Sequence, residues 1–276
     1  MPLLPGRVLA EKILDELRIE ISSKQLKPIL AAILVGQDPS SKTYIALKQK
    51  ACQKIGVEFR LFKMRKNTTQ KKLSAQIQNL NEDKTVHGIL LQLPLPAQLN
   101  PNQAIQAIDP EKDADGFHPA NLEKFLRGDP DAILSPVPAG IKILLESTGQ
   151  NLAGKNALIT SNSEIFSKPI LKILADKNIG GSWKSCRDTD IFDATKNADI
   201  FVTACGKPQW IRGENIKKGA IIIDVGINKI APRKIVGDVD IDSVKNRASL
   251  VSPVPGGVGP LTVAFLLKNV MQLSEI

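Results

Sequence analysis

The sequence predicts an α/β protein with two parallel sheets, each covered by helices. Two observations support this fold class. Apolar runs alternate with segments of helical periodicity, and the runs carry so few polar residues that both faces of each strand are expected to be buried. This alternation occurs once before and once after a segment rich in proline and glycine at residues 128–140. Each half of the chain is therefore expected to consist of βαβ units.

The first half begins with a helix and continues with three strands. Residues 7–22 have helical periodicity, with apolar residues recurring on one face. The elements expected after this helix are a strand at 28–36, a helix that carries Tyr44, a strand at 57–62, a helix near 70–82 and a strand at 86–91.

Four further strands are expected in the second half, which begins near residue 151. They lie at 156–160, 200–205, 220–225 and, as a short piece, 235–236. A helix at about 137–147 is expected to connect the two halves. We expect residues 1–140 to form one domain, completed by a C-terminal helix at about 262–276. Residues 141–261 would form a second, Rossmann-like domain with a doubly wound parallel sheet.

Composition indicates a globular protein. Of the 276 residues, 42% are hydrophobic and 24% are charged, which excludes a disordered chain. Cys52, Cys186 and Cys205 are odd in number and widely spaced, so we expect reduced thiols and no disulfide or zinc framework. The sequence has no signal peptide and no apolar run of about eighteen residues, which predicts a cytoplasmic protein without a membrane segment.

The net charge of +9 favours an anionic partner. Nucleic acid is one candidate, but the lysines are spread along the chain and the scarce aromatic residues do not interleave with them. We therefore expect no nucleic-acid partner. A small polyanionic substrate or a phosphorylated cofactor suits the same charge.

Tyr44 and Lys48 form the most suggestive pair of side chains. Four residues turn a helix through roughly 400°, so both side chains leave the same face. A lysine beside a tyrosine in a cleft can move protons near neutral pH if its surroundings lower its pKa. The alternative is a surface lysine whose aliphatic stem packs on the tyrosine.

Three loops rich in proline or glycine carry further candidates. Gln92 follows a predicted strand and can hydrogen-bond an amine such as Lys48 without adding charge. Residues 109–119 contain several carboxylates and His118, but a metal site needs more donors at tighter spacing, so no metal is expected. Residues 252–262 combine glycines with the start of the last helix, which favours close backbone approach and oxygen-rich ligands.

These segments resemble those of the bifunctional methylenetetrahydrofolate dehydrogenase/methenyltetrahydrofolate cyclohydrolase family. The resemblance extends over nearly the whole chain, and the similar segments occur in the family's order at 35–48, 92–96, 112–119, 223–228, 237–239 and 253–262. It implies a folate-binding catalytic domain, an NAD(P)-binding domain and an active-site cleft between them.

The resemblance also implies a role for each matched residue of the folate site. Lys48 would activate water for attack on the methenyl bridge, and Tyr44 would pack on the folate and position the lysine. Gln92 would hydrogen-bond Lys48, and Asp115 would hold the pterin ring. The other residues implied to contact the folate are Ser41, Leu91, Leu93, Pro94, Gly256, Gly257 and Thr262.

The implied cofactor is NADP, with NAD as the alternative. The residues implied to bind it are Ser161, Asn162, Ser163, Cys205, Gly206 and Ile227. Family members usually have Gly-x-Ser-x-x-Val-Gly-x-Pro here, whereas this chain has serine at both glycine positions, 161 and 167. These side chains would crowd the approach of a pyrophosphate. Asn162 stands where an arginine often binds the 2′-phosphate, and Lys184 or Arg187 could compensate.

Three functions therefore remain open. The first is the bifunctional enzyme of one-carbon metabolism and purine biosynthesis, and the second is a cyclohydrolase with impaired or lost dehydrogenase activity. The third is a non-catalytic folate-binding protein, against which the intact set of Tyr44, Lys48, Gln92 and Asp115 argues. The resemblance implies a homodimer acting on tetrahydrofolate derivatives. Because the chain ends at Ile276, we expect no fused synthetase domain.

Overall fold

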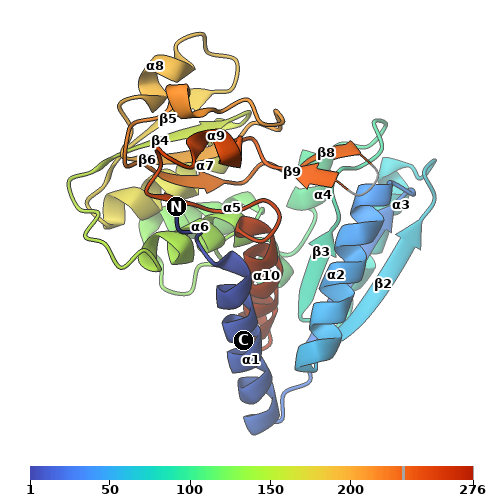
Figure 1. The fold of residues 1–276 in the computed structure, drawn as a ribbon. Coiled ribbons are helices and arrows are strands. Elements are labelled where there is room, and N and C mark those ends of the chain that lie inside the picture. The colour runs from blue at the N-terminus through green and yellow to red at the C-terminus, as the bar shows by residue number, and fades with distance from the viewer. Residues whose placement is uncertain (232–233, 276) are drawn as a thin grey trace. The chain divides into compact units, whose positions relative to one another are not determined.

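The computed structural model describes residues 1–231 and 234–275 and divides the chain into two compact units (Figure 1). One unit contains Ala10–Pro136 and Val263–Ile276, and we call it the small-sheet unit. The other contains Met1–Leu9 and Val137–Thr262, and we call it the large-sheet unit. Both units are α/β with parallel sheets, which confirms the predicted fold class.

The small-sheet unit is built on three parallel strands in the order β2-β1-β3. Strand β1 (Ile29–Val35) lies in the centre and is buried along its whole length, while β2 (Glu58–Met64) is a partly exposed edge and β3 (Gly88–Leu91) is the other edge. The apolar runs that predicted β1 and β3 thus correspond to buried strands. The carboxyl ends of all three strands meet at one edge of the sheet.

Helices α1 (Gly6–Ser23), α2 (Pro39–Ile55) and α3 (Gln70–Glu82) match the predicted helices. Three short elements were missed, namely α4 (Pro101–Gln106), the 3-10 helix η1 (Pro110–Lys112) and α5 (Pro119–Arg127). Each begins with a proline and has a side-chain cap, provided by Asn100, Asp109 and His118 respectively. A cap residue followed by proline is a recognisable start signal, although the helices are too short to show periodicity.

The large-sheet unit contains a five-stranded parallel sheet in the order β10-β7-β6-β4-β5. The strands are β4 (Asn156–Ser161), β5 (Gly180–Ser185), β6 (Ile200–Ala204), β7 (Ile221–Asp224) and β10 (Leu250–Val251). Strand β5 was not predicted, because it is an exposed edge strand and its sequence contains no apolar run. Near the start of the chain, Leu3 forms a bridge with Val251.

The predicted strand at 235–236 lies outside this sheet. It belongs to β9 (Lys234–Val236), which pairs antiparallel with β8 (Asn228–Ala231) as a separate two-stranded sheet. The helical elements of the unit include α6 (Pro136–Glu146), α7 (Glu164–Asp176), α8 (Ile191–Thr195), η2 (Gly213–Asn215), α9 (Ile241–Val244) and the first part of α10 (Val258–Leu273). None of the described helices is long and apolar enough to cross a membrane.

The expectation that all three cysteines are reduced was wrong. Cys186 and Cys205 form a disulfide, with their Cα atoms 5.6 Å apart. The two residues follow β5 and β6, which lie on either side of β4, so the bond passes over the carboxyl end of β4. Spacing in sequence could not show this proximity, because it depends on the order of the strands in the sheet. Cys52 is free and buried, and burial raises the pKa of its thiol to about 12.

Candidate functional site

Helix α2 carries the lysine–tyrosine pair. Gly36 (φ +84°) turns the chain after β1, and Asp38 then caps the helix by accepting a hydrogen bond from Ser41 N at 2.7 Å. Tyr44 and Lys48 are both half-buried on the same helical face. Burial raises the pKa of the Tyr44 hydroxyl, so this side chain is neutral at physiological pH.

The expected contact between Lys48 and Gln92 is present. Lys48 Nζ lies 3.2 Å from Gln92 Oε1, and Gln92 Nε2 donates a 2.7 Å hydrogen bond to the carbonyl of Leu93. Because its nitrogen is engaged in this way, the Gln92 side chain presents its oxygen to the lysine. The residue comes directly after β3, and its backbone N–H bonds Ile33 O of the central strand. The sheet itself therefore holds an uncharged acceptor against the Lys48 side-chain nitrogen.

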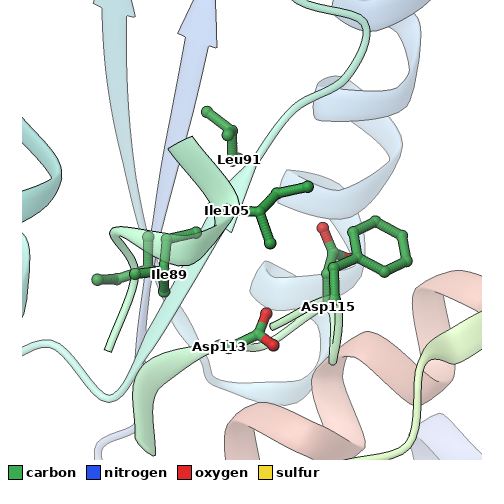
Figure 2. A pocket seen from close by; sticks show the side chains of 7 residues that line it. Ile89, Leu91, Ile105, Asp113 and Asp115 are labelled. Carbon is green, nitrogen blue, oxygen red and sulfur yellow. The ribbon is translucent and has the colours of Figure 1, made fainter. Parts of the chain in front are cut away.

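Asp115 lies in a small pocket of the same unit. Figure 2 shows Asp113 and Asp115 on one loop, near the apolar side chains of Ile89, Leu91 and Ile105. Desolvation raises the pKa of Asp115 to about 6; the positive charge of Lys48 opposes this rise, and the negative charge of Asp113 adds to it. Lys48 is thus close enough to act electrostatically on Asp115, and the three principal candidates gather around one edge of the small sheet.

The remaining predicted folate contacts in this unit line the same strand ends. Ser41 is only 2% exposed, and its hydroxyl has no hydrogen-bond partner within the described part of the chain. A buried hydroxyl without a hydrogen-bond partner is energetically costly. Leu91 is buried, Leu93 is half-buried, and Pro94 is exposed after a cis Leu93–Pro94 peptide bond.

Gly256, Gly257 and Thr262 lie in the large-sheet unit, where the two glycines have a local structural explanation. Gly256 has a φ of +112°. A Cβ on Gly257 would lie 2.7 Å from Pro253 O, and Gly257 N donates to that same oxygen. The Thr262 hydroxyl bonds Gly259 O within the last helix. This loop therefore requires glycine for its own fold, whatever it binds.

The two serines that replace glycine are accommodated inside the large-sheet unit. Both are buried, and their hydroxyl oxygens lie 2.9 Å apart. Ser161 Oγ also donates to Ser163 O at 2.7 Å and accepts from Trp183 Nε1 at 2.9 Å. The hydroxyls are thus satisfied by protein groups. Ser163 caps α7 by accepting from Phe166 N.

The neighbouring loop at 205–207 is held by a buried carboxylate. Asp238 accepts from the backbone N–H groups of Cys205, Gly206 and Lys207 at 2.6, 3.2 and 3.0 Å. It also accepts from Thr203 and Asn228. Asp238 lies in the similar segment at 237–239, but the sequence predicted no role for it. Ile227, the last predicted cofactor contact, is exposed immediately before β8.

A second buried carboxylate, Asp224, accepts from the backbone of Gly226, Asp238 and Val239. Desolvation raises its pKa to about 7, which the backbone donors oppose and Asp238 reinforces. Added Cβ atoms at Gly226 and Gly237 would meet the carboxylates of Asp238 and Asp224. The glycines of these motifs therefore allow the carboxylates to approach the backbone closely.

Comparison with known proteins assigns both parts of the chain to one family. Residues 4–115 match the family model for the tetrahydrofolate dehydrogenase/cyclohydrolase catalytic domain, and residues 135–276 match the model for the NAD(P)-binding domain of the same family. The chain belongs to the tetrahydrofolate dehydrogenase/cyclohydrolase family. The candidate site in the small-sheet unit thus lies in the family's catalytic domain, and the Ser161 turn lies in its NAD(P)-binding domain.

Individual members of the family are similar over their full length. The bifunctional protein FolD of Acetivibrio thermocellus is 43% identical over 99% of this chain and 96% of its own. The crystal structure of the bifunctional FolD enzyme of Campylobacter jejuni has a TM-score of 0.94 at 38% identity, covering 100% of this chain and 99% of that one. The Trypanosoma brucei enzyme, complexed with NADP and an inhibitor, has a TM-score of 0.93 at 34% identity, covering 100% and 98%.

The described residues contain no group of three or more histidine, cysteine, aspartate or glutamate side chains that could hold a metal ion. The candidate functional side chains of the small-sheet unit are one lysine, one glutamine, one tyrosine and one aspartate. This set can move a proton and hold a polar ring.

Proposed function

We propose that this chain catalyses two consecutive reactions of one-carbon metabolism. It oxidises 5,10-methylenetetrahydrofolate to 5,10-methenyltetrahydrofolate and then hydrolyses the product to 10-formyltetrahydrofolate. The observation that carries the proposal is the Lys48–Gln92 contact of 3.2 Å beside Asp115, in a chain of this family. The bifunctional relatives, which are similar over their whole length, support both activities.

Hydrolysis requires a water molecule to attack the methenyl carbon, which is already electrophilic because it lies in a cyclic amidinium. The chain therefore needs to supply positioning and proton transfer. Lys48 is proposed to accept the proton of the attacking water and to return it when the ring opens. Gln92 orients the lysine without adding charge, and Tyr44 offers a neutral aromatic face to the folate.

Asp115 is proposed to bind the pterin ring. As a carboxylate it can accept two hydrogen bonds from the ring's N–H donors, an arrangement that fixes both position and orientation. The surrounding apolar side chains of Ile89, Leu91 and Phe117 suit the faces of a flat heterocycle. The free hydroxyl of Ser41 completes the proposed folate contacts.

The large-sheet unit fits a dinucleotide despite its two serines. Since the hydroxyls of Ser161 and Ser167 are engaged with each other and with Trp183, the turn after β4 is closed without a glycine. The N-terminus of α7 follows this turn at the carboxyl edge of the sheet, where pyrophosphates bind. NADP bound there would supply the hydride acceptor for the oxidation.

Arg187 is proposed to favour NADP over NAD. It is exposed just beyond the carboxyl end of β5 and takes part in none of the ion pairs among the described residues, whereas Lys184 is paired with Asp190 at 2.7 Å. We expect Arg187→Ala to raise the KM for NADP about tenfold and to leave the KM for NAD unchanged. Lys218→Ala is the matched control, since Lys218 is exposed at the amino end of β7, on the opposite edge.

The two activities are tested on one preparation. Oxidation of methylenetetrahydrofolate is followed with NADP and with NAD, and hydrolysis of methenyltetrahydrofolate is followed without either. Activity in both assays is expected. Hydrolysis without oxidation would replace the proposal with a monofunctional cyclohydrolase, and folate binding without turnover would indicate a binding protein.

We further propose that the enzyme works in the cytoplasm as a homodimer, as the resemblance implies. Light scattering during size-exclusion chromatography tests the dimer, and a mass near the 30.0 kDa of one chain would contradict it.

A further inference from the structure

Asn269 connects the C-terminal helix to the loop that carries Asp115. It lies on α10, is only 6% exposed, and belongs with that loop to the small-sheet unit. Its side-chain nitrogen donates to two backbone carbonyls, Ala114 O at 2.9 Å and Leu134 O at 3.0 Å. Both N–H groups of the amide are therefore used on backbone that is distant in sequence.

The first of these carbonyls belongs to the peptide bond between Ala114 and Asp115. A hydrogen bond to it fixes the plane of that peptide and hence the direction in which the Asp115 side chain leaves the backbone. The next residue, Gly116, has a φ of +62°, and an added Cβ would lie 2.8 Å from Ser135 N. Residues 114–116 are thus pressed against residues 133–135, and Asn269 bonds both segments.

The other end of the loop is held independently. Asp113 is 2% exposed, and its carboxylate accepts from His118 N at 2.7 Å and from Asn121 Nδ2 at 3.1 Å. Asn121 also donates to Pro110 O at 3.0 Å. This network fixes the chain before and after Asp115, but its bonds do not involve the Ala114–Asp115 peptide. That peptide depends on Asn269.

We propose that Asn269 is a positioning residue for the folate reaction, which acts by holding the Asp115 carboxylate in the direction that the pterin ring requires. Small displacements of a positioned group have large effects on binding and turnover, so a side chain without ligand contact can influence both. The inference rests on the proposed function, because it assigns Asn269 an effect through Asp115.

The test compares Asn269→Ala with Gln272→Ala. Gln272 lies one turn further along α10 and also donates to a backbone carbonyl, that of Asp131 at 3.1 Å, but no hydrogen bond joins its side chain to residues 114–116 in the described part of the chain. We expect Asn269→Ala to raise the KM for methenyltetrahydrofolate, and the Kd for tetrahydrofolate, about tenfold. Gln272→Ala should leave both constants within about twofold. Equal effects of the two variants, or an unchanged Kd for Asn269→Ala, would overturn the proposal.

A double-mutant cycle separates this inference from the proposed function. Asp115→Asn alone should weaken tetrahydrofolate binding. If it does not, the role proposed for Asp115 is wrong, and the inference about Asn269 is wrong with it. If it does, adding Asn269→Ala to Asp115→Asn should cause much less than a further tenfold loss, because both changes remove the same contact. Full additivity of the two losses would show that Asn269 acts by some other route.

A second variant covers the case in which Asn269→Ala does not fold, as judged by circular dichroism. Asn269→Ser keeps a donor but is too short to bond both carbonyls, and it leaves room for water. The same rise in Kd, with an unchanged circular dichroism spectrum, is expected. Binding equal to that of the parent protein would contradict the proposal.

Discussion

The hydroxyl oxygens of Ser161 and Ser167 lie 2.9 Å apart inside the large-sheet unit, at the two positions where the resemblance leads one to expect glycine. Each serine therefore provides the other with a polar partner, and the tight turn after β4 is maintained by side-chain hydrogen bonds. The sequence alone suggested that these serines crowd the cofactor. Their burial shows that the side chains are accommodated by the domain interior.

Replacement of Ser161 by alanine should destabilise the large-sheet unit. The change leaves Trp183 Nε1–H without its 2.9 Å acceptor and removes the partner of Ser167, which should cost about 1–3 kcal/mol. Both tryptophans of the chain, Trp183 and Trp210, lie in this unit, so fluorescence during urea unfolding reports on it alone. Ser182→Ala, on the exposed strand β5, is the control. Equal midpoints for the two variants would contradict the structural role of the serine pair.

Lys48→Met should reduce methenyltetrahydrofolate hydrolysis by about 100-fold or more while leaving the fold intact. The substitution keeps the length of the side chain but removes the amine next to Gln92 that is proposed to carry the proton. Hydrolysis is measured with circular dichroism as the check on folding. Lys50→Met, on the exposed side of the same helix, should keep parental activity. Unchanged turnover in Lys48→Met would remove Lys48 from its proposed role.

Folate binding should weaken as the pH falls through about 6. The pKa of Asp115 is raised to about 6, so below that pH the carboxyl becomes protonated and can no longer accept two hydrogen bonds from the pterin. The Kd for tetrahydrofolate, measured by calorimetry between pH 5 and 8, tests this dependence. Asp115→Asn should bind weakly with a flatter pH profile. A parental profile that is equally flat would argue against Asp115 as the titrating group.

The raised pKa of Asp115 also makes the stability of the folded protein depend on pH. The pKa of Asp115 in the folded protein lies above its ordinary value of 3.8. Its contribution to the free energy of unfolding is therefore most favourable below pH 3.8 and is lost as the pH rises through about 6. The stability of Asp115→Asn relative to the parent protein should therefore be higher at pH 8 than at pH 4. Thermal unfolding at both pH values measures the difference. A gain that is larger at pH 4 would show the opposite sign.

The disulfide predicts a thiol count. Denatured but unreduced protein should contain one reactive thiol, from Cys52, and reduction should raise the number to three. In native protein, Cys52 should react slowly because it is buried and its thiol pKa is about 12. Three thiols before reduction would show that the bond is absent from the isolated protein.

Reduction should affect the dinucleotide site more than the folate site. The disulfide passes over the turn at Ser161, where Cys186 N bonds Ser161 O and Asn162 Nδ2 bonds Cys205 O. Cys205→Ser should therefore raise the KM for NADP and leave hydrolysis near its parental rate. Cys52→Ala, which removes the buried free thiol and leaves the disulfide intact, is the control for losing a cysteine elsewhere in the chain. Equal losses in both activities would indicate a global effect.

The parts of the fold that were predicted are those with strong local signals. The buried strands β1, β3, β4, β6 and β7 carry apolar runs, and α1 carries a long periodic stripe. Strand β5 was missed because an exposed edge strand needs no apolar sequence. The short proline-initiated helices were missed because they contain too few residues for periodicity to be seen.

The sequence predicted only those site residues that stand in recognisable motifs. Tyr44, Lys48, Gln92 and Asp115 stand in recognisable motifs, and the structure shows the Lys48–Gln92 contact that the motifs indicated. Asn269 and Asn121 were missed, since each is a single amide whose partners lie far away in sequence. Asp238 stands in a similar segment, but its three backbone partners at 205–207 could not be inferred from its neighbours in sequence.

By itself, the sequence determined the fold class, the family and the lysine proposed to carry the proton, because these depend on periodicity and on motifs that are contiguous in the chain. The tertiary structure decided how the serine pair, the disulfide and the Asn269 contacts are made. Each of these depends on which strands and loops lie side by side, and hydrogen bonds a few ångströms long between distant residues leave no pattern in a single sequence. Strand order and loop packing, which only the folded chain supplies, therefore explain how the turn after β4 accommodates two buried serines.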